Sequence, residues 1–120
     1  MKVIVLATNR INRLNEELKR EISDIIHRLV KDPRIPDFVS VTKVETSKDM
    51  KHAKVYISVL DNNADTKDLE AALKSATGFI KKEIAKGVKM RFIPELQFIM
   101  DHSIEYGMRM AKLIDDLKNA

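Results

Sequence analysis

Apolar residues recur at every third or fourth position from Ile11 to Leu29, and this stripe constrains the fold more than any other feature of the chain. Such spacing predicts one long amphipathic helix with a single apolar face. The helix must end by Asp32, because Pro33 and Pro36 remove backbone donors and push the residues before them toward extended conformations. The chain therefore begins with a helix that needs an apolar surface to cover it, followed by a linker over residues 32–37.

Three strands are predicted after this helix. Residues 38–44 and 53–60 are rich in β-branched side chains, with apolar residues at every second position. The short polar connection from Ser47 to Lys51 should join them as an antiparallel hairpin. A third strand follows Pro94 over residues 95–100, where Leu96, Phe98 and Met100 alternate with other residues.

Two further helical regions lie on either side of this third strand. The first begins near Asp65 or Thr66, and the glycine of Ala76-Thr77-Gly78 should break it into two short helices that meet at an angle. The last helix should be capped by Asp101 or Ser103. One side of it carries apolar residues, namely Ile104, Met108, Ala111, Ile114 and Leu117.

This order of elements predicts an α+β fold of two layers. Helices between the second and third strands require a crossover, and its right-handed form places all the helices on one face of a three-stranded sheet. A chain of 120 residues forms one domain by length, so we expect a single domain over residues 1–120. The outward sheet positions can stay solvated, and they are Lys43, Glu45, Lys54, Tyr56 and Ser58.

The opening segment and the cysteine content bear on the compartment. The apolar stretch within residues 1–7 is too short to span a bilayer, and Thr8 or Asn9 is expected to cap the helix after it. The chain has no cysteine, in agreement with a reducing compartment. We therefore predict a cytoplasmic protein that does not bind membranes.

Positive charge gathers in one segment of a chain whose net charge is only +4. Residues 79–91 contain five cations and a single carboxylate, that of Glu83. Clustered cations release counterions when they neutralise phosphates. These candidates for RNA contact are Lys81, Lys82, Lys86, Lys89 and Arg91. The alternative is an ordinary solvated helix face.

Other candidates for RNA contact are scattered along the chain. Arg10 and Arg13 carry a net local positive charge at the start of the first helix. Weaker candidates are the hairpin residues Lys48, Lys51 and His52, together with Tyr56, which could stack an unpaired base from the solvated sheet face. Near Gly78 a bend could bring backbone amides to a phosphate, or the glycine could simply cap a helix.

Catalysis and metal binding are not predicted. Asp101-His102-Ser103 holds the letters of a hydrolase triad, but adjacent residues cannot converge on one nucleophile, and helix capping explains them. His27, His52 and His102 share no metal-ligand spacing, and thiolates are absent. We expect no metal, no cofactor and no small-molecule substrate. Four of the six methionines are expected to fill the core, namely Met90, Met100, Met108 and Met110.

The order of elements is similar to the type II KH domain, an RNA-binding fold that clamps nucleic acid at a Gly-x-x-Gly hinge. Here Ala76-Thr77-Gly78 stands at the hinge, a substitution that resembles the ribosome-binding factor A family. Further segments agree with that family in order and spacing: RINRL at 10–14, KREIS at 19–23, DPR at 32–34, HAKVYISV at 52–59, and MRFIPELQF at 90–98 followed by Asp101 and Ser103.

The resemblance implies a bacterial factor that binds the immature small ribosomal subunit and its 16S rRNA precursor. It also implies a non-catalytic role in processing the 5′ end of that rRNA, most important in the cold, and we expect a monomer. An alternative is a general single-stranded RNA-binding KH module, which the missing Gly-x-x-Gly disfavours. An RNA hydrolase would need an acid–base or metal set that the sequence does not offer.

Overall fold

The computed structural model describes residues 2–59 and 66–119, and the side chains of 9–59, 66–103 and 106–119. The elements in chain order are α1 (Lys2–Arg28), β1 (Val39–Thr46), β2 (His52–Val59), α2 (Thr66–Gly87), β3 (Glu95–Met100) and α3 (Ser103–Lys118). This is the predicted α+β order with one change, within α2. The predicted strand end at Leu60, the possible helix start at Asp65 and the Ile104 side chain lie outside the described residues.

The three strands form one sheet in the order β1-β2-β3. β1 and β2 pair antiparallel, from Val39 opposite Val59 at one end to Thr46 opposite Ala53 beside the hairpin turn. β2 and β3 pair parallel, with His52 opposite Glu95. The predicted hairpin and the predicted crossover through α2 are both confirmed.

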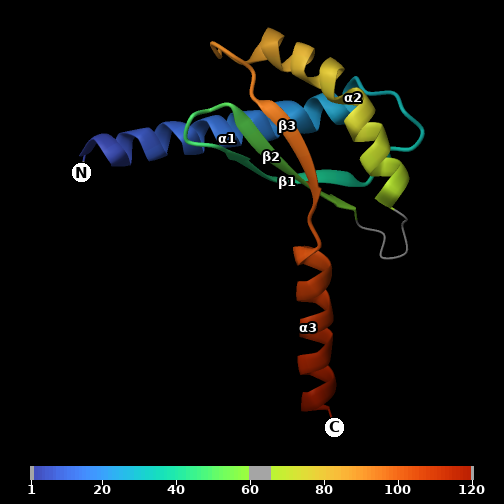
Figure 1. Cartoon of the computed structure of the whole chain (residues 1–120). Helices are drawn as coiled ribbons and strands as arrows, with labels where there is room; N and C mark the ends of the chain where they lie inside the picture. The colour runs from blue at the N-terminus through green and yellow to red at the C-terminus, as the bar shows by residue number, and fades with distance from the viewer. Residues whose placement is uncertain (1, 60–65, 120) are drawn as a thin grey trace.

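The core lies between this sheet and the two helices α1 and α2 (Figure 1). The predicted apolar stripe of α1 is confirmed from Leu14 to Ile25, whereas Ile11 is half-buried outside the core cluster and Leu29 lies beyond the helix and is 42% exposed. Because β-strands alternate their faces, every second residue of β2 and β3 joins the same cluster, whereas in β1 a shift of register between Val41 and Lys43 brings Val44 into the core after Val41. The central members of this cluster are Leu18, Ile22, Ile25, Val55, Ile57, Leu73, Ile80 and Ile84.

α1 begins six residues earlier than Thr8, so the predicted N-cap at Thr8 or Asn9 is wrong. Residues 3–7 are aliphatic and can continue a helix, and a threonine or asparagine inside a helix costs only a fraction of a kcal/mol. A residue that can cap a helix is therefore also tolerated within one.

α2 is a single helix that continues through Gly78, so the predicted separation into two helices is absent. Figure 1 shows the ribbon of α2 curving along its length. The Thr77 hydroxyl donates to the Leu73 carbonyl at 2.9 Å, a backbone contact that often bends helices. With no break at Ala76-Thr77-Gly78, the amides there lie within the helix and present no helix N-terminus to a phosphate.

α3 departs from the prediction that all helices cover one face of the sheet. It projects away from the sheet in Figure 1, and its described side chains are exposed. Met108 and Met110 are therefore exposed rather than core residues, whereas Met90 and Met100 pack against the core as predicted. Only two residues separate β3 from α3, and Asp101 between them accepts hydrogen bonds from the Thr42 hydroxyl of β1 and from the Ser103 amide of α3.

The outward sheet face is partly solvated, as predicted. Lys43 and Lys54 are exposed, and Glu45 and Tyr56 are half-buried, but Ser58 is buried. None of the described helices combines the length and hydropathy needed to cross a lipid bilayer.

Candidate nucleic-acid interface

The turn between β1 and β2 is held by its own hydrogen bonds. Asp49 accepts hydrogen bonds from the Ser47 hydroxyl at 2.6 Å and from the Lys51 amide at 3.0 Å. Met50 adopts a φ of 61°, a conformation that few residues other than glycine take. The network fixes this conformation, so the Met50 side chain is presented at the tip of the turn, where it is 41% exposed.

The hairpin turn is joined to the start of β3. The Glu95 amide donates to the Lys51 carbonyl at 2.8 Å, which brings the turn beside the connection that follows α2. A groove of about 730 Å³ opens between these two segments and α1. Its apolar lining comes from Leu14, Met50, Met90, Phe92 and Ile93, and its charged lining from Asp49, Lys51, Lys89, Arg91 and Glu95.

The two carboxylates in this groove are already engaged. Glu95 pairs with Lys81 at 2.7 Å, and this hydrogen bond lowers the Glu95 pKa below its usual value. The hydrogen bond from Ser47 similarly lowers the pKa of Asp49. In the described part of the chain, no carboxylate forms an ion pair with the three groove cations Lys51, Lys89 and Arg91. The groove therefore keeps its unpaired positive charge at the rim.

A second hollow of about 580 Å³ adjoins the groove at the end of α2. Lys89, Met90 and Arg91 line both hollows, and Lys86 lines the second. Lys82 lies one turn before Lys86 and so shares its side of the helix. Lys86 pairs with Glu83 at 3.0 Å, and Lys81 is only 27% exposed in its pair with Glu95. The predicted basic run thus borders one continuous surface, with Lys89 and Arg91 at its centre.

One of the other predicted cations, Arg10, lies on the side of α1 that borders the groove. Leu14 lines the groove, and Arg10 lies one helical turn before it on the same side of α1. Arg13 is the neighbour of Leu14 in sequence, and both arginines are exposed. Residues from three distant parts of the chain therefore gather around one apolar hollow.

Lys48 and His52 are exposed beside the hairpin but do not line the groove. Tyr56 lies on the outward sheet face, where its hydroxyl donates to Glu45 at 3.2 Å. Lys43 lies over the Tyr56 ring, with its Nζ 5.7 Å from the centroid. Both the hydroxyl and one ring face of this predicted stacking residue are thus already in contact with other side chains.

The aromatic residue that sequence reasoning missed is Phe92. Its side chain is 74% exposed at the edge of the groove, and the Arg91 Cζ lies 5.6 Å from its ring centroid. A signal was present in the sequence, since Phe92 stands between the basic run and Pro94, outside any alternating strand pattern. An apolar side chain in such a connection has no assured place in the core.

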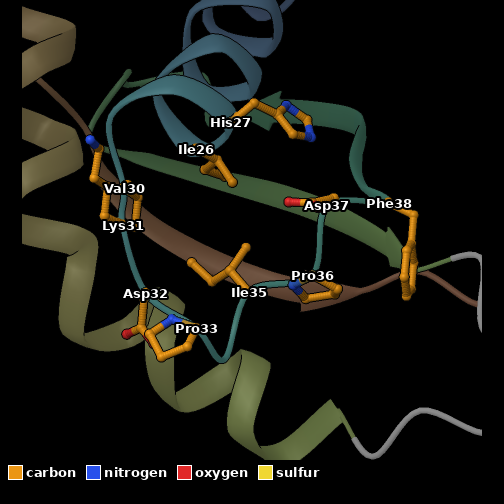
Figure 2. Close-up of a pocket in the computed structure, with 10 residues that line it drawn as sticks. All are labelled: Ile26, His27, Val30, Lys31, Asp32, Pro33, Ile35, Pro36, Asp37 and Phe38. Carbon is orange, nitrogen blue, oxygen red and sulfur yellow. The ribbon is translucent and has the colours of Figure 1, made fainter.

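A third hollow, of about 690 Å³, lies at the other end of the sheet (Figure 2). Figure 2 shows His27 pointing toward the start of β1, where its Nε2 lies 2.7 Å from the Val39 carbonyl oxygen. Lys31, Asp32 and Asp37 line this hollow, so it lacks the excess of cations seen in the groove. Hydrogen bonds from Arg34 lower the Asp32 pKa to about 2.

The residues with the letters of a hydrolase triad hold the start of α3. One Asp101 oxygen accepts the Thr42 hydroxyl at 2.7 Å, and the other accepts the Ser103 amide at 2.9 Å. His102 occupies the N-cap position without a capping side-chain bond, so Asp101 supplies the predicted acceptor. Among the described residues, no three His, Cys, Asp or Glu side chains are grouped where they could hold a metal ion.

Comparison with known proteins identifies the family. The sequence profile of ribosome-binding factor A matches residues 10–114. The chain belongs to the ribosome-binding factor A family. Ribosome-binding factor A of Caldanaerobacter subterraneus is 45% identical over 108 residues, which cover 90% of this chain and 88% of that protein. The family match includes every residue that lines the groove.

Solved structures of ribosome-binding factor A agree with this fold. The crystal structure from Thermus thermophilus superimposes with a TM-score of 0.68 at 28% identity, covering 78% of this chain and 97% of that one. A homology model of the Thermus thermophilus factor, fitted into a cryo-EM map of a 30S complex with that factor, gives a TM-score of 0.60 at 26% identity. That match covers 73% of this chain and 91% of the other.

Proposed function

We propose that this protein is a non-catalytic assembly factor that binds the immature small ribosomal subunit and its 16S rRNA precursor. It acts as a monomer in the cytoplasm, through one KH type II-like unit over residues 1–120, and assists processing of the rRNA 5′ end. Membership of the ribosome-binding factor A family is the observation that carries this proposal. A relative fitted into a 30S complex supports the small subunit as the partner.

RNA contact is assigned to the surface that borders the groove. Lys89 and Arg91 form its centre, with Lys82 and Lys86 on α2, Lys51 at the hairpin and Arg10 and Arg13 on α1 around it. Phosphates are bound by cations that lie near one another and are free of carboxylate partners. Lys81 and Lys86 contribute less than the sequence suggests, because Glu95 and Glu83 already hold their ammonium groups.

Charge reversal tests this assignment. Lys89→Glu with Arg91→Glu should abolish sedimentation with precursor small subunits in a salt series. The matched control is Arg109→Glu with Lys118→Glu, which makes the same change in net charge at exposed cations of α3. The milder double variant Lys89→Gln with Arg91→Gln should make the salt dependence less steep. The negative slope of log affinity against log salt should shrink by about 1.4 in magnitude if the two contacted phosphates are single-stranded.

Three outcomes separate the proposal from its alternatives. Loss of subunit binding in the groove variant alone, with unchanged thermal unfolding, supports it. Equal affinity of the wild type for a short oligonucleotide and for the subunit supports a general single-stranded RNA-binding module instead. Cleavage of the labelled oligonucleotide would contradict a non-catalytic role.

A further inference from the structure

We propose that the groove between the hairpin turn and residues 89–95 holds an unpaired RNA base, stacked on Phe92. The proposal rests on the function proposed above and names the form of RNA that this surface takes. Such a site requires an exposed aromatic ring, an apolar surface beside the ring, and cations within reach of the phosphates on either side of the base.

Most of Phe92 is exposed, although the Arg91 guanidinium lies over one face of its ring, as Lys43 lies over the ring of Tyr56. Phe92 is 74% exposed, and no other phenylalanine or tyrosine among the described residues exceeds this fraction. Its ring has no hydroxyl that needs a partner, in contrast to Tyr56 on the outward sheet face. Every base has a π-face, so stacking on phenylalanine needs no particular base sequence.

The groove surface beside the Phe92 ring is apolar. Leu14, Met50, Met90 and Ile93 line the groove next to Phe92, and each comes from a segment anchored elsewhere. Leu14 belongs to the packed face of α1, and Met90 and Ile93 pack against the core. Met50 is held in place by the hydrogen bonds of the turn. A flat ring can therefore enter this hollow without a rearrangement of the backbone.

The positive charge around this apolar surface favours an anionic chain over an apolar peptide. Lys51 stands on the hairpin side, and Lys89 and Arg91 stand on the opposite side, while both groove carboxylates have local partners. The Arg91 guanidinium lies 5.6 Å from the Phe92 centroid, close enough to reach the phosphate of a base stacked on that ring. An unpaired nucleotide offers both a flat apolar face and adjacent negative charge.

Substitution at Phe92 tests the stacking. Phe92→Ala should weaken binding to precursor small subunits by roughly 5- to 150-fold, the range expected for loss of one base–aromatic stack, and Phe92→Tyr should retain it. Phe38→Ala is the matched control, because Phe38 is 47% exposed at the opposite end of the sheet. Equal binding by Phe92→Ala and Phe38→Ala would overturn the stacking while leaving the phosphate contacts of the proposed function intact.

A photocross-link identifies the occupant. Benzoylphenylalanine in place of Phe92, irradiated on precursor small subunits, should give an adduct that ribonuclease trims to a short oligonucleotide. A cross-link to a ribosomal protein would show that an apolar peptide fills the groove and would overturn the proposal. Absence of any RNA adduct from a variant that still sediments with the subunit would overturn it as well.

Discussion

Gly78 offers a direct test of what the middle of α2 contributes to the protein. It lies inside a continuous helix, its φ is not positive, and a Cβ built on it meets no atom within 4 Å. Alanine can therefore occupy this position without strain or collision. Because glycine loses more backbone entropy than alanine when a helix forms, Gly78→Ala should raise the free energy of unfolding by about 0.5–1 kcal/mol.

Thermal and urea denaturation followed by circular dichroism measure this change. For a domain of this size the expected gain corresponds to a rise in Tm of about 2–6 °C. Subunit binding should not change, because the Gly78 amide lies within the helix and is not free to contact a phosphate. A loss of stability would refute this reasoning, since it would mean that the glycine adopts a conformation or a close contact that alanine cannot share.

The other two glycines provide controls within the same chain. A Cβ on Gly107 also meets no atom within 4 Å, but α3 packs little against the rest of the protein. Gly107→Ala should therefore leave the cooperative transition unchanged. A Cβ on Gly87 would lie 2.6 Å from the Glu21 Oε1, so Gly87→Ala must displace that carboxylate and should gain less than Gly78→Ala.

Three further results are expected. The Thr46 hydroxyl is buried without a hydrogen-bond partner among the described residues, so Thr46→Val should raise the urea-unfolding free energy by about 1 kcal/mol, and a decrease would contradict this. Removal of residues 103–120 should shift that free energy by less than about 0.5 kcal/mol, because the described side chains of α3 are exposed; a larger fall would reveal packing of α3 on the core. Hydrogen bonds from Thr42 and then from Ser103 lower the pKa of Asp101. The ionised Asp101 therefore stabilises the fold above about pH 4, and this stabilisation is lost as the pH falls through its folded-state pKa. Asp101→Asn should flatten the decline in the free energy of unfolding measured from about pH 5 to pH 2.

The elements that could be predicted from the sequence are those whose pattern is local. The three-to-four spacing in α1, the alternation in β2 and the prolines that α1 cannot pass each act within a few residues. The prediction was wrong where tertiary packing decided the outcome. Gly78 is tolerated within α2 because Ile80 and Ile84 on the same helix are fully buried, and this burial outweighs the helix propensity of one glycine.

The spacing of apolar residues in α3 does not predict whether this helix packs against the sheet. Its apolar residues repeat as they would in a core helix, yet Leu113, Ile114 and Leu117 are each more than half exposed. The pattern shows that one face is apolar and not which surface covers it.

The candidate site was predictable in its charges but not in its geometry. The cations near residues 86–91 were evident from composition, whereas the groove exists because the Glu95 amide meets the Lys51 carbonyl across 44 positions of sequence. The same distance in sequence explains why Tyr56 was preferred to Phe92. Alternation identifies the outward face of a strand, but it cannot identify which connection lies beside a distant turn.

The five cations of the basic run are not equally free to bind a phosphate. Glu95 opens β3 and binds the Lys81 ammonium group, so this lysine ties α2 to the sheet before it can meet a phosphate. A glutamate at position 81 would face Glu95, and the first consequence would fall on the packing of α2 against β3. Lys89 and Arg91 lie beyond the end of α2 and have no such carboxylate partner within the described residues. Reversal of charge at those two positions therefore reports on RNA contact, whereas reversal at Lys81 would mix RNA contact with folding.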